Sequence, residues 1–258
     1  MRLMKRILSA AAVLALSASL LVGCSSGTAS SVPVFASSAA ESTVSSVEET
    51  ASSAVDENEA AAAQLLNDLT GSYQELWPVI LADEYKQTWL DDCTALVGED
   101  NAEAAFEKLS SMVTGDVYGE DAVKAYANGG GAYFCGFTNS LATLTFDGET
   151  STISGTDKDG NVLFSHTYHY IGMEPVHGLY EFESDDADSG EFTYFFLAPD
   201  TSAETYHIEF RYGLDAEALS QYDAGEYAYW VASGISTDCD QTMIDNCIEL
   251  FCTENLAG

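Results

Sequence analysis

The chain has 258 residues, with 42 Asp and Glu against only 8 Lys and Arg, and a formal net charge of −34. Binding to nucleic acid needs clustered lysine and arginine to neutralise phosphates, so this composition argues against a nucleic-acid partner. The same shortage of cations argues against electrostatic attachment to anionic lipid headgroups.

The first 24 residues have the layout of a bacterial lipoprotein signal. A basic start precedes an apolar run at 7–22, and the run ends in Leu-Val-Gly-Cys at 21–24. Serines interrupt the run, which is short for a membrane span of about 20 apolar residues, so a signal peptide is favoured over a transmembrane helix. We predict that residues 1–23 are removed and that lipid on Cys24 anchors the protein to the cell membrane, on its extracytoplasmic side.

A tether and one domain follow the anchor. Residues 24–62 are rich in Ser, Ala and Glu and contain few large apolar side chains, which predicts a disordered segment. Residues 63–258 are long enough to form one domain with a substantial core.

The first part of this domain, 63–128, has helical periodicity. Six apolar residues recur at helical spacing near its start: Leu65, Leu66, Leu69, Tyr73, Leu76 and Trp77. A second stripe contains Trp89 and Cys93, and a third helix is expected at 102–112.

The part at 132–212 alternates apolar and polar residues between short turns, as strands do. Even spacing and short turns favour a closed or nearly closed antiparallel barrel. Helices are expected again within 215–258. The expected fold class is therefore α+β and mainly β, with an antiparallel barrel flanked by N-terminal and C-terminal helices.

Neither the cysteines nor any catalytic motif in the sequence indicates a specific function. After Cys24, five cysteines remain, an odd number that cannot pair completely, and no Cys-x-x-Cys occurs. Motifs of serine hydrolases, zinc proteases, P-loop proteins and dinucleotide-binding proteins are absent from the sequence. We therefore do not predict an enzyme.

Several passages, taken in order, resemble one known family. They are LTGSYQELWP at 69–78, the strand entry at 132–146, YHYIG at 168–172, GLYEFE at 178–183, LAP at 197–199 and AETYHI at 203–208. Their collinear order is similar to that of the ZinT (YodA-like) family of extracytoplasmic zinc-binding proteins. The resemblance implies a lipocalin-like (calycin) barrel with a zinc site at its mouth and, as partner, a metal ABC transporter.

The family binds zinc through three histidines, and this chain matches that set in part. His207 falls on one family ligand, whereas Thr205 and a position near Phe195 fall on the other two. The site is either lost or rebuilt from neighbouring residues. Glu209 shares the strand face of His207, and His177 precedes a nearby strand, so His207, Glu209 and His177 are the candidate metal ligands.

Two functions remain open at this point. The first is binding of a divalent metal, zinc foremost, for scavenging or delivery to a transporter. The second is a metal-free barrel that binds a small apolar or peptide ligand among its aromatic residues, such as Phe195 and Tyr206.

Overall fold

The computed structural model describes residues 57–198 and 207–256. The signal peptide, Cys24 and the predicted tether up to residue 56 lie outside the described residues. Residues 57–62, which were predicted to belong to the disordered tether, are instead part of a helix, and Ala62 is fully buried in the core. The described chain begins with a helix at 57–68 and continues with β1 (Gly71–Glu75), α3 (Leu76–Ile80), η3 (Asp83–Tyr85), α4 (Lys86–Val97), α5 (Glu99–Met112), α6 (Glu120–Ala127), β2 (Thr143–Asp147), β3 (Thr152–Thr156), β4 (Val162–Met173), β5 (Tyr180–Ser184), η4 (Gly190–Phe192), β6 (Tyr194–Leu197), β7 (His207–Gly213), α7 (Ala216–Leu219), β8 (Ala232–Ser236) and α8 (Gln241–Leu256). None of the helices in this part of the chain combines the length and the apolar character that crossing a membrane requires.

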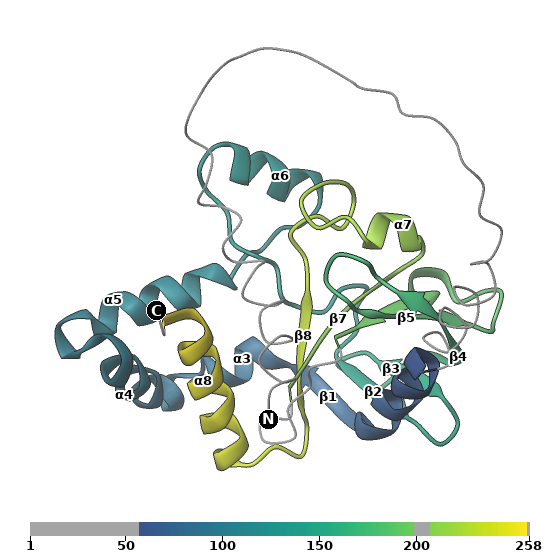
Figure 1. The fold of residues 1–258 in the computed structure, drawn as a ribbon, viewed down its shortest axis with the longest axis horizontal. Helices are drawn as coiled ribbons and strands as arrows, with labels where there is room; N and C mark the ends of the chain where they lie inside the picture. The colour runs from purple at the N-terminus through teal and green to yellow at the C-terminus, as the bar shows by residue number, and fades with distance from the viewer. Residues whose placement is uncertain (1–56, 199–206, 257–258) are drawn as a thin grey trace, which may run out of the picture.

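The strands form a closed antiparallel barrel in which each strand pairs with the next one along the chain (Figure 1). The ring closes where β1 pairs with β8, with Gln74 opposite Ile235. Closure removes the unpaired edges that an open sheet would expose. The expected antiparallel barrel with flanking helices is confirmed.

Two of the barrel strands lie outside the span expected for the barrel. β1 falls within the region 63–128 that was expected to be helical, and β8 falls within the region 215–258 that was also expected to be helical. Tyr73 in β1 points into the barrel, where its ring meets Phe146 at a centroid distance of 5.7 Å. Barrel closure therefore overrides the local helical spacing around Tyr73.

β8 has the sequence ASGIS, in which small residues replace the usual large apolar ones. The reason is the tight approach of neighbouring strands. A Cβ on Gly234 would lie 3.1 Å from the side chain of Ile208 and 3.4 Å from the carbonyl oxygen of Gln74. A strand that must fit between such close neighbours cannot show the apolar alternation that identifies strands in sequence.

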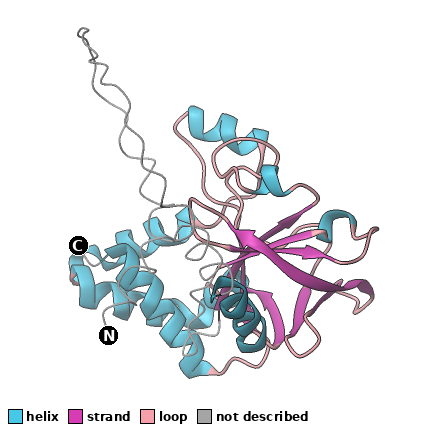
Figure 2. Ribbon diagram, turned by 45° about the vertical axis from the view of Figure 1, so that its right-hand side comes forward, coloured by secondary structure: helices cyan, strands magenta, loops and turns pink. Residues whose placement is uncertain are grey.

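A helical layer of α4, α5 and α8 stands beside the barrel (Figures 1 and 2). Trp89 lies at its centre, fully buried, and its ring contacts Phe106 of α5 and Phe251 of α8 at 5.6 and 5.9 Å. Its indole N–H donates a hydrogen bond of 2.7 Å to the carbonyl oxygen of Ile80. The predicted apolar stripe through Trp89 and Cys93 is thus the face that joins the three helices.

Aromatic rings fill the barrel interior. Phe195 stands at its centre, 5.4 Å from both Tyr168 and Tyr212 and 5.9 Å from Phe164. All four side chains are less than 5 % exposed. The interior is therefore a packed core, and the described rings occupy the space that an apolar ligand would need. Tyr206 lies outside the described residues.

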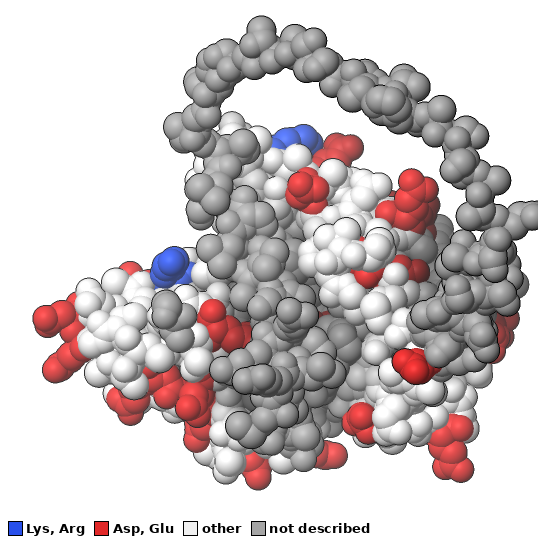
Figure 3. All heavy atoms as spheres, in the orientation of Figure 1, with Lys and Arg blue, Asp and Glu red and all other residues white. Residues whose placement is uncertain are grey.

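Acidic side chains cover much of the surface. On the face in Figure 3, Asp and Glu are spread over both the helical layer and the barrel, and Lys and Arg appear in two small areas. Arg211 is fully buried, so the exposed cations of the described chain are the four lysines, Lys86, Lys108, Lys124 and Lys158. The described surface therefore carries a strongly negative field that attracts cations.

Candidate metal centre

Strand β7 presents two faces of different chemistry. Ile208, Phe210 and Tyr212 belong to the barrel core. Because side chains alternate along a strand, His207, Glu209 and Arg211 lie on the outer face. His207 and Glu209 therefore share one face of strand β7, and that face lies outside the barrel.

His207 begins β7 opposite Ile235 of β8, and its side chain is partly buried. Burial lowers the pKa of His207 to about 4, because the charged imidazolium loses hydration. The imidazole is therefore neutral at pH 7, and this is the form that binds metal ions.

Glu209 lies opposite Ser233 of β8, close to two buried thiols. Burial, with a further contribution from the Glu209 carboxylate, raises the pKa of Cys247 to about 12 and also raises that of Cys135. Cys135 and Cys247 are metal-binding side-chain types close enough to Glu209 to feel its charge, and the sequence analysis left them without a role. Only the tertiary structure identifies these two cysteines, because they lie far from Glu209 in the sequence.

His177 lies in the turn between β4 and β5, in different surroundings from those expected. Its Nδ1 atom is 3.4 Å from an oxygen of Glu174, and its ring contacts that of Tyr222 in a tilted arrangement, with the ring centroids 3.8 Å apart. Glu174 is fully buried and accepts the backbone N–H groups of Val176 and His177. Burial lowers the pKa of His177 despite the opposing effect of Glu174.

The three candidate ligands do not assemble into one site in this structure. Within residues 57–198 and 207–256, no three His, Cys, Asp or Glu side chains are placed to hold one metal ion together. His207 and Glu209 remain as a pair on the outer face of β7. His177 belongs to the cluster with Glu174 and Tyr222.

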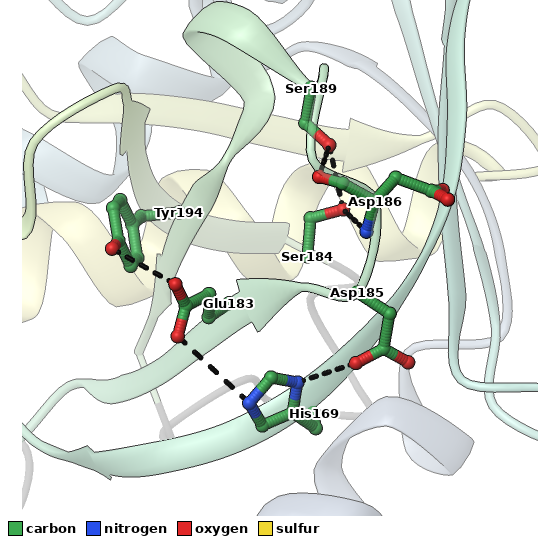
Figure 4. A network of polar contacts seen from close by, with 7 residues as sticks. All are labelled: His169, Glu183, Ser184, Asp185, Asp186, Ser189 and Tyr194. Atoms are coloured by element: carbon green, nitrogen blue, oxygen red, sulfur yellow. Dashed lines mark hydrogen bonds and ion pairs between the residues drawn. The ribbon is translucent and has the colours of Figure 1, made fainter.

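The other two histidines bind the acidic turn that follows β5. His166 lies 2.8 Å from Asp186, and His169 lies 2.8 Å from Asp185 and 4.0 Å from Glu183. Figure 4 shows His169 between its two carboxylates, with Tyr194 donating to Glu183 at 3.1 Å. Two imidazole–carboxylate contacts therefore hold this turn against strand β4.

We expect the stability of the protein to fall between about pH 6.5 and pH 4 because of His207. Its folded pKa of about 4 lies below the unfolded value, so the unfolded state binds more protons in this window. The free energy of unfolding then decreases as the pH is lowered, by at most about 3 kcal/mol, and less because His207 is partly exposed.

An NMR titration of the His207 ring protons measures this pKa directly. Urea unfolding at pH 7 and pH 5 should show a smaller difference for His207→Gln than for the wild type. A His207 pKa of about 6.5, the value of a solvated histidine, would contradict the prediction.

No family model matches the sequence, and no curated protein matches it significantly. Solved structures similar to this chain include the Zn(II)-bound ZinT-like domain of Streptococcus pneumoniae AdcA, at 15 % identity and a TM-score of 0.44, over 70 % of this chain and 87 % of that one. Zn(II)-bound AdcA from the same organism is similar at 13 % identity and a TM-score of 0.40, over 70 % of this chain and 33 % of that one. Similarity at this level gives no information about individual ligands.

Proposed function

We propose that this chain is an extracytoplasmic lipoprotein, anchored through lipid on Cys24, whose barrel binds a divalent metal ion, zinc foremost, at His207 and Glu209. One observation carries the proposal: a partly buried imidazole, whose pKa is lowered to about 4 by burial, shares the outer face of β7 with a carboxylate two residues away. Zinc accepts imidazole nitrogen and carboxylate oxygen ligands.

The surroundings of the pair support this choice. The acidic surface raises the local concentration of cations, and burial keeps His207 deprotonated at neutral pH. Two protein ligands leave coordination positions for water, which suits a metal that is captured and passed on, as scavenging or delivery to a metal ABC transporter requires. The part of the predicted tether that precedes the helix at 57–68 would give the domain reach from the membrane.

Calorimetric titration of zinc into the mature chain, without an affinity tag, tests the proposal. We expect His207→Ala to weaken zinc binding at least about tenfold, the lower end of the cost of losing even an outer partner of a metal site. Glu209→Gln should weaken it as well. Binding should decrease as the pH approaches the pKa of His207, since a protonated imidazole cannot coordinate the ion.

His169→Ala is the matched control, because His169 is a more exposed histidine bound to carboxylates on another strand. It should leave zinc affinity unchanged, and magnesium should compete poorly at equal concentration. Absence of zinc binding by the wild type up to about millimolar concentration would refute metal binding. Equal affinity of wild type and His207→Ala would place the ion elsewhere.

A further inference from the structure

The structure assigns a disulfide bond that is formed after export, between Cys93 of α4 and Cys252 of α8. The two sulfur atoms lie 3.9 Å apart, and both side chains are fully buried. The inference rests on the extracytoplasmic location within the proposed function, because structural disulfides form and persist in oxidising compartments.

The helices already bring the two thiols face to face. A disulfide has a sulfur–sulfur distance of about 2.05 Å, so the sulfurs must approach by about 1.9 Å, a movement within the range of side-chain rotation. Phe251, next to Cys252 in α8, contacts Trp89 of α4 at a centroid distance of 5.9 Å. The helix pair is thus held in register beside the proposed bond.

Bond formation requires an oxidant, and a thiol–disulfide oxidoreductase of the extracytoplasmic space supplies the correct chemistry. The thiolate of one cysteine attacks the disulfide of the oxidoreductase and forms a mixed disulfide, releasing one of its sulfurs as a thiolate. The second cysteine of this protein then attacks the sulfur of the first in the mixed disulfide, which forms the Cys93–Cys252 bond and releases the remaining sulfur of the oxidoreductase as a thiolate. Two protons leave the protein, and its two electrons reduce the oxidoreductase to the dithiol.

Burial determines when the bond can form. It raises the pKa of both Cys93 and Cys252, so little reactive thiolate exists in the folded protein, and an external oxidant cannot reach sulfurs that are fully buried. The bond therefore forms before α8 has packed against α4. Once formed, it is shielded from reductants by the same packing.

The remaining cysteines fit this assignment. Pairing Cys93 with Cys252 leaves three of the five described cysteines, Cys135, Cys239 and Cys247, as thiols. The bond would close a loop of 159 residues that contains most of the barrel. Closure of so long a loop constrains the unfolded chain strongly, and we expect it to raise the melting temperature by about 5–15 °C.

Peptide mapping of the exported full-length chain tests the assignment. Thiols are alkylated in denaturant without reduction, and the protein is cut after Lys and after Glu. Trypsin cuts after Lys86 and Lys108 and so isolates Cys93, whereas a glutamate-specific protease cuts after Glu249 and Glu254 and isolates Cys252. A cross-linked peptide with both cysteines is expected. Alkylation of both residues, or a link from Cys252 to any other cysteine, would overturn the assignment.

A stability measurement provides the second test. Reduction in denaturant, followed by refolding in the presence of the reductant, should lower the melting temperature of the wild type and of Cys239→Ala, a control at a partly exposed thiol, but not that of Cys93→Ala/Cys252→Ala. An equal decrease of the melting temperature on reduction in the wild type, Cys239→Ala and the double variant would overturn the assignment. Protease accessibility of the chain in intact cells separates failed export from failed pairing, and zinc titration of the double variant reports independently on the metal site.

Discussion

Arg211→Ala is expected to lower the free energy of unfolding by about 3–5 kcal/mol, which makes Arg211 one of the most important single side chains for stability. Arg211 is fully buried on the outer face of β7. Its guanidinium donates hydrogen bonds to the backbone carbonyl oxygens of Leu219, Gln221 and Tyr227 and lies 4.3 Å from the centre of the Tyr222 ring.

These contacts hold the connection between β7 and β8. Without β8 the barrel cannot close, because β8 is the strand that pairs with both β7 and β1. Alanine would leave three carbonyl groups without their donor and would remove the packing of the arginine stem. The substitution should therefore destabilise the connection and, through it, the pairing of β8 with β7 and β1 that closes the barrel.

Urea unfolding followed by circular dichroism measures this effect. Arg211→Lys keeps the charge but cannot reproduce the planar array of donors, so an intermediate loss is expected. Lys124→Ala, which removes an exposed cation beside Glu120 and Asp121, should leave the unfolding midpoint unchanged. A loss below about 1 kcal/mol for Arg211→Ala would show that the carbonyls find other partners or water.

Trp89→Ala is expected to cost a similar amount, about 3–5 kcal/mol, through a cavity at the centre of the helical layer. The ring is fully buried between α4, α5 and α8, so its removal leaves Phe106 and Phe251 without a common partner. The near-ultraviolet circular dichroism of the aromatic residues should change, while the barrel strands persist in the far-ultraviolet spectrum.

Trp89→Phe separates packing from hydrogen bonding. Phenylalanine fills most of the volume but cannot donate to the carbonyl oxygen of Ile80, so a smaller loss of about 1–3 kcal/mol is expected. Chemical unfolding of the two variants in parallel gives both values. Equal losses for Trp89→Ala and Trp89→Phe would show that the hydrogen bond, not the ring volume, dominates at this position.

Local pattern determined much of the architecture. The run of alternating strands from β2 to β7 was predictable because each strand presents one face to a core and pairs with its neighbour in sequence. The stripe of Trp89 and Cys93 was predictable because an amphipathic helix repeats its apolar side chains every three to four residues. The shared face of His207 and Glu209 follows from strand alternation alone.

Tertiary structure decided what depends on residues far apart in the chain. β1 and β8 become strands because the barrel needs partners to close, although Tyr73 lies in a helical pattern and β8 consists mostly of small residues. The turn between β4 and β5 places His177 against Glu174 and Tyr222 rather than in a three-ligand site with His207 and Glu209. The facing of Cys93 and Cys252 arises only when the last helix packs on α4, because no local pattern relates two residues 159 positions apart.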